Sequence, residues 1–459
     1  MKKGTLFPAF ILFAVLSSYG QWSTTYLSEG KIRMGGATLG SKAFFAGGAV
    51  VVSSNWVDVD KVEIYDLETG LWEMNYLTQA REAASGVTCG DKVFFAGGID
   101  MNSPALTCYS NVDIYNSLGY WGTVDLSVPR FALSAVSKDS LVLFAGGYDI
   151  GLNQAYDVVD IYNTNTNTWL PGKYLSIPRA CMGCAVVGDL AFFAGGSNAD
   201  NSVVYDRVDI YNFTTGAWDT ATLSQARSFI GATVAQNKVI FAGGSISNGV
   251  PSDRVDIYDY ENDTWTTDTL SLARGFFGQS ATVCGKAYFV GGGIFNWGWD
   301  TDTDTIDVYD PVADQWSVMT MPDRLNDHTV VTIDSSMLIA GGWSFTNYPY
   351  GNPQKNVEIY KDSVCSYGIN DGITSPPVQS GLFKVYPNPS SGDIHLEMGN
   401  NNHQKCLLAN IYNFQGKVVF TQSLTPGGLE LNVKLPDGIY LLNVTSDDFT
   451  QTELITIQN

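Results

Sequence analysis

The chain repeats one pattern of residues with a period close to 49, and this pattern returns seven times. Each unit contains an Arg, an apolar run, a Gly-Gly pair, a variable segment, an acidic residue two positions before a Tyr, and a Trp. A period of this length indicates an array of small units, each of which buries its apolar surface against its neighbours. The sequence therefore predicts a repeat architecture.

Four markers keep in step along the array. The glycine pairs begin at Gly47, Gly97, Gly146, Gly195, Gly243, Gly291 and Gly341. The arginines are Arg33, Arg81, Arg130, Arg179, Arg227, Arg274 and Arg324. The acids and tyrosines are Glu63 and Tyr65, Asp113 and Tyr115, Asp160 and Tyr162, Asp209 and Tyr211, Asp256 and Tyr258, Asp307 and Tyr309, and Glu358 and Tyr360. The tryptophans are Trp22, Trp72, Trp121, Trp169, Trp218, Trp265 and Trp316.

Each unit has the pattern of four short antiparallel strands. Runs such as residues 62–65 alternate with a period of two, and Asn, Asp and Gly separate the runs. The four markers together resemble the kelch repeat over roughly residues 22 to 360. The resemblance implies an all-β fold, with a seven-bladed kelch β-propeller over residues 21–362.

The Trp series is offset from the other markers, because Trp22 precedes the first Arg and no Trp follows Tyr360 in the array. We expect the strand around Trp22 to complete the blade that ends at Tyr360. Such pairing of the two ends removes the open sheet edges of a propeller.

The repeated arginines and acids predict ion pairs. Both faces of a blade pack on neighbours, so a carboxylate on the third strand of each blade needs a partner. Seven of the nine arginines belong to the Arg series, which is the only cation series in step with every acid. We expect structural Arg–acid pairs, in preference to a ring of arginines for an anionic ligand.

The two ends of the chain indicate export. Residues 1–20 have the pattern of a signal peptide, with Lys2 and Lys3, an apolar run at 6–16, and small residues Ser18 and Gly20 before the cleavage point. No later stretch reaches the length of a membrane span, so no transmembrane segment is expected. The net charge of −21 argues against nucleic acid as a partner.

A different pattern follows the repeats. Residues 363–383 have the composition of a linker. The motifs at 386–392, 411–419 and 435–441 then resemble, in order and place, the C-terminal sorting domain of the type IX secretion system of Bacteroidetes-like bacteria. The resemblance covers residues 384–459, and its turn-and-strand pattern fits a small immunoglobulin-like β-sandwich. It implies that the chain is secreted or displayed on the outer face of the cell by the type IX machinery.

Ligand-binding residues are expected on the loops between the second and third strands of each blade. These loops differ in every unit, and the kelch resemblance places them on one face. Three of them are rich in aromatic residues, which stack on sugar rings or, alternatively, cap the propeller or pack on the C-terminal domain. The candidate residues are Trp56, Phe295, Trp297, Trp299, Trp343, Tyr348 and Tyr350.

One of these loops also contains a candidate calcium site. Asp300, Asp302 and Asp304 provide carboxylates at alternate positions, the oxygen ligands that Ca²⁺ prefers. The run lacks the Gly and Glu of an EF-hand loop, so a solvated loop is the competing interpretation. No other cofactor and no catalytic residue are expected.

The sequence favours a secreted or cell-surface binding protein whose loop face engages a glycan or protein. The alternatives are a carbohydrate-active enzyme that uses loop carboxylates, and a surface adhesin or scaffold component. The residue inventory argues against a copper radical oxidase, a kelch enzyme whose copper needs two His and two Tyr, because only His328 lies in the repeats. Neither the ligand nor the attachment follows from the sequence.

Overall fold

The computed structural model divides the chain into two compact units, Met1–Ser366 and Tyr367–Asn459. It describes residues 21–362 except 276–278, 297–298 and 346–350, and in the second unit residues 383–386, 390, 393–398, 407–412, 418–424, 430–436, 438–445 and 450–458. The expected signal peptide at 1–20 lies outside the described residues, as does almost all of the expected linker.

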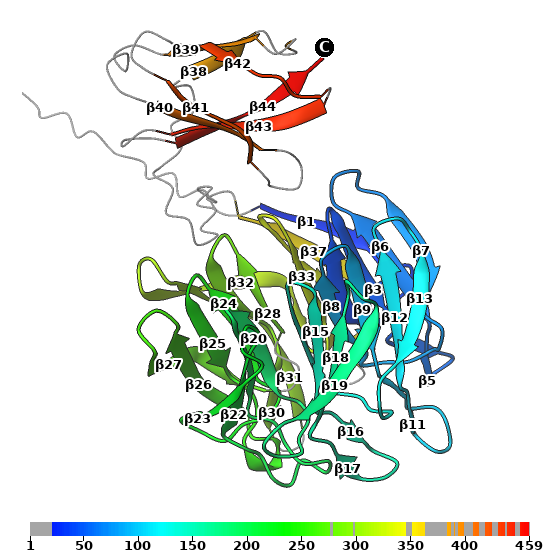
Figure 1. The fold of residues 1–459 in the computed structure, drawn as a ribbon. Helices are drawn as coiled ribbons and strands as arrows, with labels where there is room; N and C mark the ends of the chain where they lie inside the picture. The colour runs from blue at the N-terminus through cyan, green and yellow to red at the C-terminus, as the bar shows by residue number, and fades with distance from the viewer. Residues whose placement is uncertain are drawn as a thin grey trace, which may run out of the picture. The chain divides into compact units, whose positions relative to one another are not determined.

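The first unit consists of four-stranded antiparallel sheets that follow one another along the chain (Figure 1). The first sheet contains β2 (Gly35–Leu39), β3 (Lys42–Ala46), β6 (Lys61–Asp66) and β7 (Trp72–Tyr76). The second contains β8 (Ser85–Cys89), β9 (Lys92–Ala96), β12 (Asn111–Asn116) and β13 (Trp121–Asp125). The third contains β14 (Ser134–Lys138), β15 (Leu141–Ala145), β18 (Val158–Asn163) and β19 (Thr168–Tyr174).

The next sheets continue this plan. The fourth contains β20 (Gly183–Val187), β21 (Leu190–Ala194), β22 (Arg207–Asn212) and β23 (Trp218–Thr222). The fifth contains β24 (Gly231–Ala235), β25 (Lys238–Ala242), β26 (Ser252–Asp259) and β27 (Thr264–Arg274). The sixth contains β28 (Gln279–Val283), β29 (Lys286–Val290), β31 (Trp299–Asp310) and β32 (Gln315–Leu325), with β30 (Gly293–Asn296) added on β31. The last contains β33 (Thr329–Ile333), β34 (Ser336–Ala340), β37 (Asn356–Lys361) and β1 (Gln21–Tyr26).

The first strands of these sheets form a closed circuit. Each contacts the first strand of the next sheet, and β33 of the last sheet contacts β2 of the first. The apolar core lies between neighbouring sheets: Phe44 and Ile64 of the first sheet pack with Val93, Phe95 and Tyr115 of the second. This arrangement is a β-propeller.

Short hairpins extend the loops between the second and third strands, and Figure 1 shows β5, β11, β16, β17 and β30 at the same lower end of the first unit. We call this end the loop face. Its elements are β4 (Ala49–Val52) with β5 (Asn55–Asp58), β10 (Ile99–Asp100) with β11 (Thr107–Cys108), β16 (Tyr148–Asp149) with β17 (Gln154–Ala155), β35 (Trp343–Ser344) with β36 (Asn352–Pro353), and the 3₁₀ turn Ser247–Gly249.

The two ends of the array pair as the offset Trp predicts. Strand β1 is antiparallel to β37, with Trp22 opposite Tyr360. Their ring centroids lie 5.2 Å apart. Tyr65 and Trp72 of the first sheet make the same contact at 4.9 Å. The N-terminal strand therefore replaces the fourth strand that the last repeat lacks.

The predicted ion pairs are confirmed in five sheets. In each, an Arg that is at least nine-tenths buried contacts the repeat acid of its own sheet. The N–O distances are 2.7 Å for Arg81–Asp113, 2.9 Å for Arg130–Asp160, 2.7 Å for Arg179–Asp209 and 2.7 Å for Arg274–Asp307, and Arg227 pairs with Asp256. Each acid also accepts a backbone N–H from the Ser or Thr that precedes the Arg by three positions.

The prediction was wrong for Arg33 and Arg324. In the first sheet Lys31 binds Glu63 at 2.6 Å, and Arg33 lies two positions farther on. In the last sheet the buried Leu325 takes the cation's place, Arg324 is exposed, and Glu358 accepts a hydrogen bond from Thr24 at 2.7 Å. Lys31 lies four residues after Leu27, and Leu325 lies four residues after Met321, just as Arg81 lies four residues after Leu77. This spacing marks the buried position of each sheet.

The same buried cations connect neighbouring sheets through their backbone. The N–H of Gly98 donates to the carbonyl of Arg130 in the next sheet at 3.2 Å, and the N–H of Gly342 donates to that of Lys31 at 2.8 Å. A Cβ on Gly97 would lie 2.3 Å from the Arg130 carbonyl oxygen, so this approach requires glycine. The Gly-Gly pairs thus hold each sheet against the next around the circuit.

The second unit has two antiparallel sheets. One contains β38 (Phe383–Tyr386), β39 (Asp393–Met398) and β42 (Glu430–Asn432). The other contains β41 (Val418–Leu424), β40 (Leu407–Tyr412), β43 (Gly438–Thr445) and β44 (Thr450–Ile457). Ile394 and Leu431 of the first sheet form a core with Ile411, Leu442 and Ile455 of the second.

His328 occupies an apolar position of the repeat. The corresponding residues of other sheets are Met34, Leu133, Met182 and Ile230. Only 2% of His328 is exposed. Burial lowers the pKa of His328 to about 4.

Replacing the Arg of one of the five buried Arg–acid pairs should destabilise the fold. Arg179→Met leaves Asp209 buried without its cation, so we expect the free energy of unfolding to fall by about 3–5 kcal/mol. Arg179→Met combined with Asp209→Leu should recover most of this loss in chemical denaturation. The control is Arg324→Met, which removes an exposed Arg and should change stability by less than about 0.5 kcal/mol. Equal losses in the two Arg variants would contradict the assignment.

His328 should make the fold sensitive to acid. Between pH 6.5 and about 4 the unfolded chain binds a proton on His328 and the folded chain does not, so stability falls as the pH falls through this range. The loss is on the order of 3 kcal/mol. His328→Met should therefore lose less stability than the wild type when the thermal midpoint is measured from pH 7 to pH 4. Parallel curves for the two proteins would refute this.

Candidate functional site

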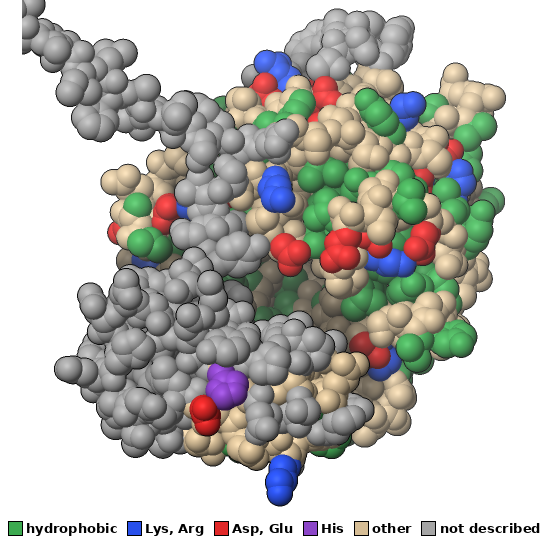
Figure 2. Space-filling model, turned by 90° about the horizontal axis from the view of Figure 1, so that it is seen from above, with side chains coloured by type: hydrophobic (Ala, Val, Ile, Leu, Met, Phe, Trp, Pro, Cys, Tyr) green, Lys and Arg blue, Asp and Glu red, His purple; other side chains and the backbone are tan. Residues whose placement is uncertain are grey.

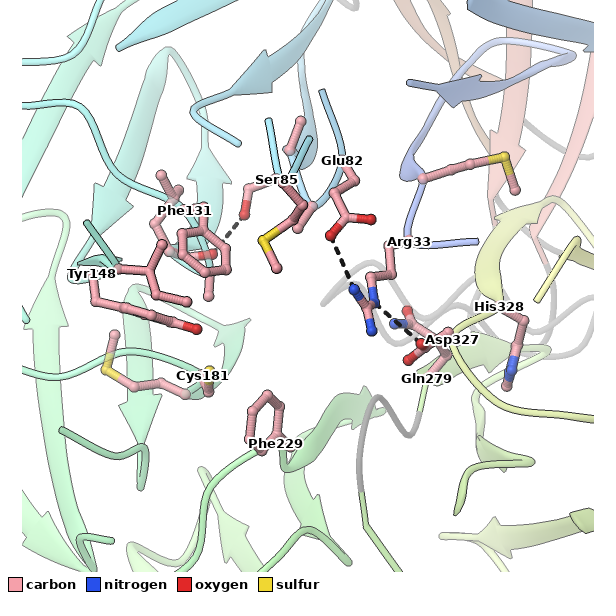
Figure 3. A pocket seen from close by; sticks show the side chains of 18 of the residues that line it. Arg33, Glu82, Ser85, Phe131, Tyr148, Cys181, Phe229, Gln279, Asp327 and His328 are labelled. Carbon is pink, nitrogen blue, oxygen red and sulfur yellow. Dashed lines mark hydrogen bonds and ion pairs between the residues drawn. The ribbon is translucent and has the colours of Figure 1, made fainter. Parts of the chain in front are cut away.

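A cavity of about 390 Å³ opens at the loop face, where the segments before the first strands of the sheets converge. Its lining comes from six of these segments, which include Arg33, Glu82, Phe131, Cys181, Phe229 and Asp327, and from Gln279 at the start of β28. The cavity therefore lies at the mouth of the space that the circuit of sheets encloses (Figure 3).

One repeat position supplies a side chain to this cavity from sheet after sheet. It lies two residues after the buried cation, or after Leu325 in the last sheet, and has a left-handed backbone. The residues, with φ in degrees, are Arg33 (53), Ala83 (54), Ala132 (52), Cys181 (55), Phe229 (53) and Asp327 (52). Most are small or apolar, so Arg33 and Asp327 are the residues that break the pattern.

A charged cluster occupies one side of the cavity. The Arg33 Nε donates to Asp327 Oδ2 at 3.1 Å, and its Nη1 donates to Glu82 Oε1 at 2.9 Å (Figure 3). The Arg33 side chain is 33% exposed, whereas that of Glu82 is 5% exposed. Burial alone would lower the pKa of Arg33, but the charges of Asp327 and Glu82 raise it. Burial also raises the pKa of Glu82, and Arg33 opposes that change.

Aromatic side chains line the other side. Phe131 packs on Tyr148 with ring centroids 4.2 Å apart, and Phe229 extends the apolar wall. Figure 3 shows Phe131, Tyr148 and Cys181 across the cavity from Arg33 and Asp327. Burial raises the pKa of Cys181 to about 12, so this free thiol stays protonated at neutral pH.

Asp58 connects the charged side to the loop hairpins. It ends β5 and is buried, and its Oδ2 accepts the N–H of Met101 at 2.9 Å and the amide of Asn102 at 2.8 Å. Burial and the charge of Glu82 raise its pKa to about 7. Since Met101 lines the cavity, Asp58 holds part of the cavity wall in place.

Two of the expected aromatic ligand-binding residues meet on the loop face. The rings of Trp56 and Trp343 lie 5.4 Å apart at 38°, and Trp343 contacts Phe345 at 5.9 Å. Trp56 remains 40% exposed. The backbones of Phe295 and Trp299 lie in the β30–β31 hairpin. Trp297, Tyr348 and Tyr350 lie outside the described residues.

The expected calcium ligands lie on strand β31. The strand pairs with β30 on one side, with Asp302 opposite Gly293. Asp302 is buried and accepts the N–H of Phe345 at 3.0 Å, which ties the last two sheets together. Burial raises the pKa of this carboxyl. Asp304 is partly buried, and no group of three His, Cys, Asp or Glu among the described residues is placed to hold a metal ion.

The cavity residues were missed by sequence reasoning. Arg33 was counted with the structural arginines, and Glu82 and Asp327 were not singled out. Counting four residues from Leu27 would have assigned Lys31 to the ion pair and left Arg33 unexplained. No comparable signal marks Phe131, Tyr148 or Phe229.

Two further observations concern partners. Figure 2 shows one face of the molecule, on which Lys and Arg side chains lie scattered and not gathered into a patch. Within the described part of the chain, no helix is long and apolar enough to cross a membrane.

Family models match one segment in each unit of the chain. Residues 226–267 match the kelch motif, and residues 384–458 match the secretion system C-terminal sorting domain. No match was found among curated proteins.

A solved structure supports the fold of the first unit. The structure described as "Structure of YjhT" superimposes with a TM-score of 0.51 and 15% identity, over 64% of this chain and 99% of that one. At this identity the likeness concerns the fold alone. The chain thus carries a kelch motif within a β-propeller, followed by a C-terminal sorting domain that directs secretion.

Proposed function

We propose that this chain is an exported glycan-binding protein and that the cavity of its loop face holds the glycan. In this proposal residues 21–362 form a seven-bladed kelch propeller, and residues 384–459 form an immunoglobulin-like sorting domain. The observation that carries the proposal is the two-sided cavity, with aromatic rings opposite a hydrogen-bonding cluster.

The two sides of the cavity match the two kinds of surface on a sugar. A sugar ring presents apolar C–H faces, which stack on aromatic rings such as Phe131 and Tyr148. Its hydroxyl groups both donate and accept hydrogen bonds, and Arg33 offers donors beside the acceptors of Glu82 and Asp327. A concave site with few polar groups on apolar walls is typical of small-ligand binding.

The Trp56–Trp343 pair extends the site for longer glycans. Ile32, next to Arg33, bridges to Ala49, the first residue of the hairpin that carries Trp56. Asn326, next to Asp327, bridges to Trp343. The aromatic pair therefore belongs to the same two sheets as Arg33 and Asp327, and it offers a stacking surface for further sugar units.

A protein ligand is the second candidate. The β4–β5 hairpin exposes Val51, Val52, Trp56 and Val57 together, and exposed apolar patches mark protein interaction sites. The kelch motif is also typical of protein-binding propellers. An adhesin or scaffold component would use this surface.

A carbohydrate-active enzyme is the third candidate. Glu82 has a raised pKa and lies beside a second carboxylate, Asp327, across Arg33. Glycoside hydrolysis uses paired carboxyl groups of which one stays protonated. Release of reducing sugar from any bound glycan would distinguish this candidate from simple binding.

Glycan binding should depend on the aromatic pair. Because Trp56 and Trp343 offer stacking faces, Trp56→Ala and Trp343→Ala should each weaken binding of array-identified oligosaccharides by about tenfold, on the order of 1–1.5 kcal/mol. Tyr120→Ala is the control, since Tyr120 is an exposed aromatic at 69% outside the loop face. An array without hits, or equal losses in all three variants, would contradict the proposal.

Export should require the second unit. A chain truncated after residue 383 lacks the sorting domain matched at 384–458. In a type IX-secreting bacterium it should accumulate inside the cell envelope, while the full chain appears in the medium or on the cell surface. Immunoblots of the fractions test this, with full-length Tyr120→Ala, which replaces an exposed residue, as the control. Equal amounts of the truncated and full chains outside the cell would overturn the assignment.

A further inference from the structure

We infer that the loop-face cavity selects sugars that carry a protonated amino group over neutral and anionic sugars. This inference rests on the proposed glycan-binding function and adds the charge class of the ligand. It comes from the balance of charges in the cavity wall and from their position opposite the aromatic side chains.

Acidic groups outnumber basic groups in the wall. Among its described lining residues Arg33 is the only Lys or Arg, whereas Glu82 and Asp327 are both acidic. Each carboxylate contacts the same guanidinium, at 2.9 Å and 3.1 Å. With both carboxylates ionised, the two acids outnumber the one guanidinium, and the cluster carries a net negative charge.

The neighbouring titratable groups do not make the net charge of the cavity wall positive. His328 also lines the cavity, but burial lowers its pKa to about 4 and keeps it neutral. Asp58 lies close enough to Glu82 to interact with its charge. Lys31 is fully buried and paired with Glu63, so its charge is already compensated. The chain as a whole carries a net charge of −21.

The charged residues differ in type from the residues that other sheets have at the equivalent positions. Arg33 and Asp327 occupy a left-handed position that holds Ala83, Ala132 and Cys181 in other sheets. At the preceding position, where Glu82 lies, other sheets have Ile32, Phe131 and Ala180. The fold therefore requires none of the three charged residues, because other sheets form with apolar or small residues at these places. A charged cluster that the scaffold does not need points to recognition of a ligand.

The aromatic wall strengthens the preference for a cation. Ring faces attract ammonium groups through their quadrupole, and this attraction grows when water is excluded. Phe131, Tyr148 and Phe229 line the side opposite the carboxylates. A protonated amine in the cavity is thus favoured from both sides, whereas a carboxylate would face repulsion from Glu82 and Asp327.

The test compares three matched sets of oligosaccharides by calorimetry with the full mature chain. The sets are oligomers of glucosamine, of N-acetylglucosamine and of galacturonic acid, at about pH 6, where the amines are largely protonated and most carboxylates ionised. We expect the glucosamine oligomers to bind at least about tenfold more tightly than the other two.

Variants of the carboxylates show whether the cluster causes this selectivity. Glu82→Gln should reduce the preference for glucosamine oligomers about tenfold. Glu82→Gln with Asp327→Asn should turn it towards galacturonic acid oligomers, because both acids of the described lining are then neutral while Arg33 keeps its charge. Asp219→Asn is the matched control, since Asp219 is exposed on β23 and does not line the cavity. Asp327→Asn alone serves if Glu82→Gln does not fold, as judged by its thermal midpoint.

The outcomes separate this inference from the proposed function. Equal or tighter binding of N-acetylglucosamine or galacturonic acid oligomers overturns the amino-sugar preference but leaves glycan binding intact. Selectivity that persists unchanged in both carboxylate variants also overturns it. Binding of none of the three sets overturns it too, and the wider glycan array then decides the proposed function.

Discussion

The buried cation at the entry to each of the first six sheets is the interaction on which the propeller depends. In five sheets an Arg side chain binds the acid of the third strand, and in the first sheet Lys31 does the same. The carbonyl of that residue accepts the N–H of a glycine in the preceding sheet. One residue therefore organises its own sheet through its side chain and the contact with its neighbour through its backbone. Leaving either charge unpaired in this interior would be costly.

Because the scaffold is regular, the residues of the loop face can vary without changing the fold. Once the cation fixes the chain entry, the residue two positions later turns towards the cavity with a left-handed backbone in sheet after sheet. The scaffold tolerates Ala, Cys, Phe, Arg and Asp at this place, so the residue can be chosen for a ligand. Charge and aromatic rings can then be placed on opposite sides of one cavity without disturbing the core.

The fold was largely predictable because the repeat supplies the same evidence many times. Strand period, glycine pairs and the offset of Trp22 predicted the sheets and the pairing of β1 with β37. The position of the cation within its turn was predicted wrongly in the first sheet. Arg33 has the residue type of the Arg series, but it lies two positions after Lys31, which forms the ion pair with Glu63. This shift of two residues places Arg33 in the cavity wall. The aromatic pair Trp56–Trp343 was predicted as part of a ligand site, and its contact came only with the structure.

By itself the sequence determined the period, the strands, the pairing partners of most buried charges and the sorting domain, since each depends on local pattern or on a motif with fixed spacing. Only the tertiary structure decided the site. Arg33 and Asp327 are separated by 294 positions in the chain, and Glu82 by 49 from Arg33, yet all three meet because the circuit of sheets closes. Arg33 and Asp327 occupy the same repeat position, but the repeat does not indicate that this position faces a cavity. The reason is physical: ring closure, and not chain proximity, sets which side chains share the cavity.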